Sequence, residues 1–79
     1  MSKIKEGEIW VNQQNYLFVV VQTNDSCINT FVRGKKWLVT RSVYRYYADD
    51  KVKRGKWRKI AEYPTWQEAV NSPEFKGKK

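Results

Sequence analysis

Residues 16–23 constrain the fold most, because they form a nearly continuous run of apolar, aromatic and β-branched side chains. A strand whose apolar residues do not alternate with polar ones is covered on both faces, so it belongs at the centre of a small barrel. The following Asn24-Asp25-Ser26 is typical of a hairpin turn, since Asn and Asp tolerate left-handed backbone and hydrogen-bond within their own turn. We therefore expect a central strand that returns as the alternating segment 27–32.

The rest of the chain fits further short strands separated by turns. We expect strands at residues 8–12, 37–42 and 56–61, with turns at 13–15 and 33–36. Residues 43–47 fit an extension of the fourth strand or a helical turn, and we favour a bend that leads into another extended segment. Residues 49–55 fit a charged loop. Four or five antiparallel strands in about sixty residues indicate a mainly β fold, a small SH3-like barrel.

The C-terminal segment changes to a helical pattern. Thr65 precedes Trp66-Gln67-Glu68 as in a capping box, and Pro73 disfavours helix at the residue before it. We predict one domain over residues 1–75, with a terminal helix at 65–72 that covers an open end of the sheet. Residues 76–79 are predicted to be a disordered basic tail. Because the helix is terminal, the SH3-like barrel is favoured over the alternative, an OB-like barrel.

Positive charge gathers between Arg33 and Lys59. This stretch holds 11 of the 16 Lys and Arg residues but two of the 8 Asp and Glu residues, so the remainder of the +8 chain nearly cancels. The aromatic residues interleaved with these charges are Trp37, Tyr44, Tyr46, Tyr47 and Trp57. Cations contact phosphates and flat rings stack on bases. The pattern therefore favours a nucleic-acid surface.

The predicted nucleic-acid-binding residues are Arg33, Lys35, Lys36, Arg41, Tyr44, Arg45, Tyr46, Lys51, Lys53, Arg54, Lys56, Trp57, Arg58 and Lys59. Alternatives stay open for the rings: Trp37 also fits the core, and a tyrosine of 44–47 fits a buried ring with a solvated hydroxyl. No spacing specifies base readout, so we expect contact with the phosphate backbone, of DNA ahead of RNA.

Several kinds of chemistry have no residues to carry them. The chain has no histidine and one cysteine, Cys27, which excludes the usual zinc sites and any Ser-His or Cys-His nucleophile. The four glycines stand apart, so there is no glycine-rich phosphate loop. Glu6 and Glu8 would share one face of the first strand, either as a seat for a metal or as solvated edge residues. We expect a binding module without enzymatic activity or cofactor.

The expected location is the cytoplasm. A single cysteine forms no internal disulfide, which fits a reducing compartment. Residues 1–6 become charged before any apolar run begins, unlike a signal peptide. The longest apolar stretch is too short to span a bilayer, so no membrane partner is expected.

The segment Ile4-Lys5-Glu6-Gly7-Glu8-Ile9-Trp10, followed by Val19-Val20-Val21 and Arg41-Ser42-Val43, resembles small phage and prophage proteins thought to form SH3-like barrels. A glycine turn that leads into a first barrel strand is also similar to KOW and Tudor-like modules. The resemblance covers residues 4–47 and leaves out the basic segment 51–59 and the terminal helix.

For function, the resemblance implies a phage accessory protein that modulates host or phage DNA or RNA transactions. The alternative is a small inhibitor that docks on an acidic surface of a host enzyme, and net charge would steer either encounter. An inhibitor should expose a contiguous apolar or aromatic patch with basic residues at its rim. A nucleic-acid binder should show a basic groove with rings along its floor.

Overall fold

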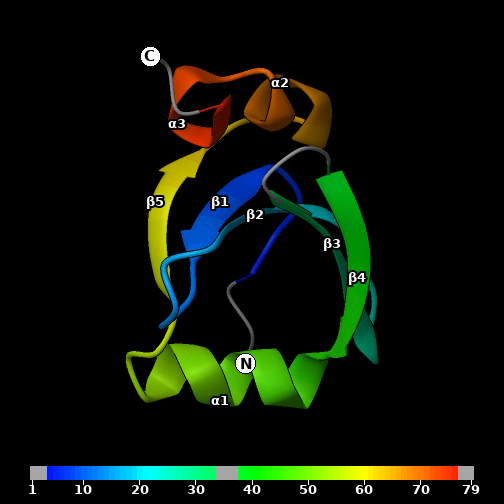
Figure 1. The fold of residues 1–79 in the computed structure, drawn as a ribbon. Helices are drawn as coiled ribbons and strands as arrows, with labels where there is room; N and C mark the ends of the chain where they lie inside the picture. The colour runs from blue at the N-terminus through cyan, green and yellow to red at the C-terminus, as the bar shows by residue number, and fades with distance from the viewer. Residues whose placement is uncertain (1–3, 34–37, 77–79) are drawn as a thin grey trace.

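The computed structural model describes residues 4–33 and 38–76 of the chain. In this part of the chain one antiparallel sheet contains β1 (Glu8–Val11), β2 (Leu17–Thr23), β3 (Cys27–Arg33), β4 (Leu38–Tyr44) and β5 (Arg58–Glu62). Helix α1 (Arg45–Lys53) connects β4 to β5, and α2 (Trp66–Val70) and α3 (Pro73–Lys76) follow β5. Figure 1 shows the curled sheet with α1 at one end and α2 and α3 at the other.

The strand order is that of a small SH3-like barrel. It runs β4-β3-β2-β1-β5, so four consecutive strands form a meander and the fifth returns to pair with the first. An OB-like barrel would need a helix between its third and fourth strands. Here β3 ends at Arg33 and β4 begins at Leu38, so the connection is only about one helical turn long. The prediction of a mainly β, small barrel-like fold is confirmed, and the strand order and short β3–β4 connection favour its SH3-like form.

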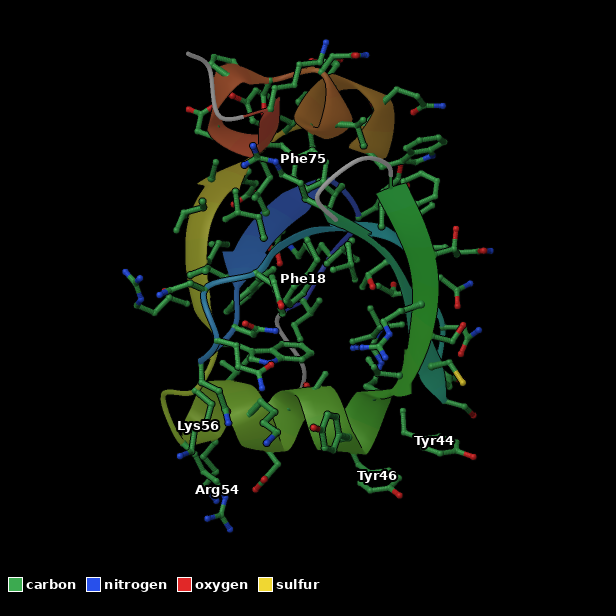
Figure 2. All side chains as sticks on the ribbon, viewed as in Figure 1. Phe18, Tyr44, Tyr46, Arg54, Lys56 and Phe75 are labelled. Atoms are coloured by element: carbon green, nitrogen blue, oxygen red, sulfur yellow. The ribbon has the colours of Figure 1, made fainter. Side chains whose placement is uncertain are left out.

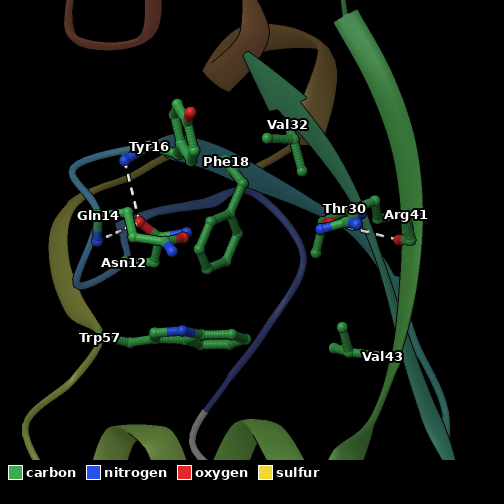
Figure 3. A pocket seen from close by; sticks show the side chains of 9 residues that line it. All are labelled: Asn12, Gln14, Tyr16, Phe18, Thr30, Val32, Arg41, Val43 and Trp57. Atoms are coloured by element: carbon green, nitrogen blue, oxygen red, sulfur yellow. Dashed lines mark hydrogen bonds between the residues drawn. The ribbon is translucent and has the colours of Figure 1, made fainter. Parts of the chain in front are cut away.

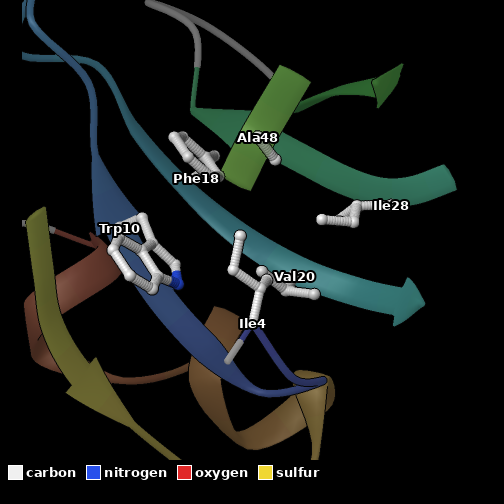
Figure 4. Close-up of a cluster of buried hydrophobic side chains, with 6 residues drawn as sticks. All are labelled: Ile4, Trp10, Phe18, Val20, Ile28 and Ala48. Atoms are coloured by element: carbon white, nitrogen blue, oxygen red, sulfur yellow. The ribbon is translucent and has the colours of Figure 1, made fainter. Parts of the chain in front are cut away.

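Both faces of β2 are buried, as its continuous apolar sequence predicts. One face joins a cluster made of Ile4, Trp10, Phe18, Val20, Ile28 and Ala48 (Figure 4). The opposite face joins a second cluster made of Ile9, Val19, Ala69 and Phe75. Helix α1 contributes Ala48 to the first cluster, while α2 and α3 supply Ala69 and Phe75 to the second. The central strand therefore depends on cover from both ends of the molecule.

The C-terminal segment forms two short helices where the sequence predicts one over 65–72. Thr65 caps α2 by accepting a hydrogen bond from the Glu68 backbone N–H at 3.3 Å, as predicted. After Val70 the chain turns, and buried Ser72 accepts from the Phe75 N–H at the start of α3. Pro73 suits this position because the first helical N–H needs no partner. Lys76 therefore belongs to α3 instead of the predicted tail, whose residues 77–79 lie outside the described part.

Helix α1 is the main departure from the sequence prediction of a bend at 43–47 and a loop at 49–55. No glycine or proline interrupts residues 45–54, so a helix is permitted. Ala48 and Val52 are one helical turn apart, and both pack on the first cluster. The Asp50 carboxylate and Arg54 Nε form an i,i+4 pair at 3.0 Å. Packing of Ala48 and Val52 against the first cluster thus stabilises a helix that the charged sequence does not predict.

Gly55 terminates α1. It has φ +76° and donates its N–H to the Val52 carbonyl at 3.1 Å. The Lys56 N–H donates to the Lys51 carbonyl at 2.8 Å. These two bonds form a Schellman motif, which requires a left-handed residue directly after the helix. The glycine near the end of the predicted loop is therefore a helix stop that turns the chain toward β5.

Two glycines with positive φ allow a matched test of the fold. A Cβ on Gly55 meets nothing within 4 Å, whereas a Cβ on Gly7 would lie 2.1 Å from the Tyr63 carbonyl oxygen. We expect Gly55→Ala to lower the free energy of unfolding by about 1 kcal/mol, the cost of left-handed backbone alone. Gly7→Ala should cost at least twice as much, because it adds a backbone clash. Urea denaturation of both variants measures this, and equal losses would contradict the tight Gly7–Tyr63 approach.

Candidate nucleic-acid interface

A pocket of about 130 Å³ opens beside the edge of the first cluster, between the β1–β2 turn, β4 and the chain entering β5 (Figure 3). Its lining is mixed: rings from Tyr16, Phe18 and Trp57, amides from Asn12 and Gln14, a cation from Arg41, and Thr30, Val32 and Val43. The sequence predicted Arg41 and Trp57 as binding residues and none of the others. The four consecutive amide residues at 12–15 were the available signal.

Trp57 is held in the wall of this pocket. Its ring meets Phe18 edge to face, with centroids 4.7 Å apart and planes at 65°. Tyr47 of α1 contacts the same indole at a centroid distance of 6.5 Å. Trp57 is half-buried and packs on the first cluster. The predicted stacking residue is thus also a core residue, and it presents part of a fixed ring to the pocket.

The β1–β2 turn is fixed by Asn12. Its side-chain oxygen accepts hydrogen bonds from the backbone N–H groups of Gln14 at 2.9 Å and Tyr16 at 3.0 Å. Asn15 adopts φ +68°, a conformation that asparagine tolerates. The turn predicted at 13–15 is confirmed, and its geometry places Gln14 and Tyr16 along the pocket.

A wider hollow of about 430 Å³ adjoins the pocket and shares Asn12, Gln14, Arg41, Val43 and Trp57 with it. It adds Gln13, Ser42, Tyr47 and Lys51. The Lys51 ammonium lies 5.0 Å from the centre of the Tyr47 ring, a cation–π contact. None of the residues that line either hollow is acidic. We call the two hollows together the groove, and its fixed charge is positive.

Further predicted residues gather around α1, at the same end of the molecule. Figure 2 shows Tyr44 and Tyr46 near one end of the helix and Arg54 and Lys56 near the other. The two tyrosine rings stack at 5.5 Å with planes 16° apart, and they are 61% and 73% exposed. Both rings therefore meet solvent, although the segment begins a helix instead of extending the strand.

Three of the predicted cations already have protein partners. Arg45 donates from Nε to the Asn24 carbonyl at 2.7 Å, Arg54 pairs with Asp50, and Lys59 pairs with Glu62 at 3.0 Å. The hydrogen bond to Glu62 raises the pKa of Lys59 above its ordinary value of 10.5. Within residues 4–33 and 38–76, five cations of the α1 end have no carboxylate within 4.0 Å: Arg41, Lys51, Lys53, Lys56 and Arg58.

The structure does not bring Arg33 to this end. Arg33 pairs with Leu38 at the start of β4, whereas α1 begins after the last residue of that strand. A seven-residue strand separates them by about 20 Å. Phe31, two residues earlier, contacts Trp66 of α2 with centroids 5.2 Å apart. Lys35, Lys36 and Trp37 lie outside the described residues.

Glu8 is neither a solvated edge residue nor half of a metal seat with Glu6. It is 1% exposed and accepts hydrogen bonds from Trp10 Nε1 at 3.0 Å and the Lys5 N–H at 3.1 Å. The Glu6 carboxylate instead accepts a hydrogen bond from the Trp66 N–H.

Across the described ranges, no group of three or more His, Cys, Asp or Glu side chains is placed to hold a metal. In the same ranges no helix has the length and apolarity to cross a bilayer.

Comparisons with protein-family models, with curated proteins and with solved structures find no match for this chain. The resemblance to phage SH3-like proteins therefore stays a prediction, and the functional argument depends on the groove and the surface around α1.

Substitution of Lys59 tests whether this predicted nucleic-acid contact instead stabilises the fold. Glu8 and Glu62 lie directly opposite each other in β1 and β5, and Lys59 Nζ contacts both, at 3.6 and 3.0 Å. Like charges facing across strands repel, so this ammonium stabilises the sheet. We expect Lys59→Met to lower the free energy of unfolding at pH 7 by about 0.5 to 1 kcal/mol, a value limited by solvent screening.

The pH dependence of that loss follows from the raised pKa of Lys59. A raised pKa in the folded state means that the stabilisation is complete below the unfolded pKa and disappears as pH rises through the folded pKa. The difference between the wild-type protein and Lys59→Met should therefore shrink above pH 10.5. Chemical denaturation at several pH values measures it, with Lys56→Met as the control. A loss of the same size in the control would contradict the assignment.

Proposed function

We propose that this chain is a non-enzymatic nucleic-acid-binding protein that contacts the phosphate backbone through the α1 end of the barrel. The observation that carries the proposal is the groove, whose two cations, Arg41 and Lys51, face no acidic lining residue. Trp57 and Tyr47 contribute rings to its lining. Cations beside fixed rings match phosphates beside bases.

Charge around the groove supports the same function. Lys53, Lys56 and Arg58 are exposed, and no carboxylate of residues 4–33 or 38–76 lies within 4.0 Å of them. When a phosphate backbone binds to such a surface, its condensed counterions are released, and this release favours binding. The favourable contribution becomes smaller as the salt concentration rises. DNA is the favoured polymer ahead of RNA. The resemblance over residues 4–47 implies that the chain is a phage accessory protein that acts in the cytoplasm.

A second candidate function is docking on an acidic surface of a host enzyme. The stacked, exposed pair Tyr44 and Tyr46 favours it, because exposed tyrosines are enriched in protein interfaces. The hollow beside this pair is lined in part by Asp25 and Asp49, which oppose a phosphate backbone, and by Arg45, the cation there that could face an acidic protein group. The tyrosine pair therefore suits a protein partner better than nucleic acid, although the sequence predicts both tyrosines as nucleic-acid contacts.

Titration of labelled duplex DNA, single-stranded DNA and RNA at two salt concentrations tests the proposal. We expect micromolar or tighter binding that weakens with salt, and Lys53→Gln with Lys56→Gln should reduce the slope of log K against log salt by about two units on duplex DNA. The matched control is Arg33→Gln with Lys76→Gln, which removes the same charge away from the groove. Equal effects of the two variants, or no binding at low salt, would contradict the proposed surface.

A further inference from the structure

The groove has two parts with different chemistry. The inner pocket has apolar walls from Phe18, Val32, Val43 and Trp57, whereas the outer hollow adds Lys51 and further polar side chains. Arg41 lines both parts. A ligand that fits the whole groove therefore has a flat or apolar portion joined to an anionic portion. A nucleotide has this construction: the base is a planar ring and the phosphate is the anion.

The size of the pocket restricts the base. Its volume is about 130 Å³. A cavity of about 150 Å³ in another protein accepts a benzene molecule, so a pocket of this size accepts one six-membered ring. A pyrimidine has one such ring, whereas a purine adds a second fused ring. The volume of the inner pocket therefore matches a pyrimidine base.

Polar groups at the pocket suit the edge of a base. Gln14 is exposed, and its side-chain amide makes no hydrogen bond within the described residues. An amide carries both donors and an acceptor, as base edges do. Thr30 is less available, because its hydroxyl donates to the Arg41 carbonyl at 3.3 Å. Gln14 is thus available to hydrogen-bond a base in the pocket.

We infer that the groove receives one unpaired nucleotide of a nucleic-acid strand, with a pyrimidine base in the inner pocket and its phosphate between Arg41 and Lys51. The inference rests on the proposed function and narrows its ligand. Bases in a duplex are stacked and paired, so a base enters such a pocket only from a single strand or after it is unstacked. Lys53 and Lys56 then meet phosphates of the flanking nucleotides.

Abasic DNA strands isolate the base from the phosphates. The probes are three short labelled strands of equal length: fully abasic, abasic with one central thymine, and abasic with one central adenine. All carry the same phosphates and none can stack on itself or pair. Fluorescence anisotropy should show the thymine strand binding about tenfold more tightly than the abasic strand. The adenine strand should bind close to the abasic strand.

Two substitutions in the pocket and one outside it test whether the thymine base binds in the pocket. Val43→Phe places a ring in the pocket and should abolish the advantage of thymine over the abasic strand. Thr40→Phe adds the same ring at an exposed position of β4 outside the groove and should preserve the advantage. Gln14→Ala changes an exposed side chain and should reduce the advantage several-fold. It serves as the readout if Val43→Phe does not fold.

The outcomes separate the inference from the proposed function. If all three strands bind equally, the phosphate-binding function stands and the pocket is not a base site. If adenine matches thymine, the size selection for a pyrimidine is wrong. Free thymidine monophosphate that binds more tightly than the thymine strand would overturn the assignment to a strand. No binding by any probe or by duplex DNA at low salt would overturn the proposed function itself.

Discussion

Burial of β2 on both faces is the constraint from which the rest of the structure follows. Phe18 and Val20 face one cluster and Val19 faces the other, and all three are at most 4% exposed. Each such side chain contributes roughly 1.5–3 kcal/mol when it leaves water. A sheet with one solvated face would lose the contribution of the side chains on that face. Helices must therefore cover both sides, and α1 is formed by this requirement, through Ala48 and Val52.

The position of α1 in turn creates the candidate site. The helix packs against the edge of the first cluster and leaves Val43 and Trp57 partly uncovered beside the β1–β2 turn. Its basic residues are carried to the rim of that opening, where Lys51 joins Arg41. The packing of α1 thus leaves a pocket with partly apolar walls next to a positively charged rim. Helix α1 contributes Tyr47 and Lys51 to the outer hollow, whereas the inner pocket is lined by the β1–β2 turn, the strands and Trp57.

The sequence predicts the strands well because alternation and turn chemistry are local: the Asn24 side chain accepts from the Ser26 and Cys27 N–H groups, as the hairpin prediction requires. The sequence does not predict α1. Its two small apolar residues, Ala48 and Val52, give little periodic signal in a charged segment, and the contacts that stabilise the helix come from distant strands. The groove is missed for the same reason: it joins residues near 12, 41, 51 and 57. A count of charges along the chain also groups Arg33 with cations from which β4 separates it.

The two ends of α1 differ in charge, and this difference bears on the competing functions. The hollow at Tyr44 and Tyr46 includes Asp25 and Asp49, whereas the groove has no acidic lining residue. Asp25 and Asp49 disfavour a phosphate strand at the tyrosine end, whereas Lys53 and Lys56 favour one at the other end of the helix. The stacked tyrosines then remain open to solvent. The proposed nucleic-acid surface and the candidate protein-docking surface are therefore separate parts of the molecule.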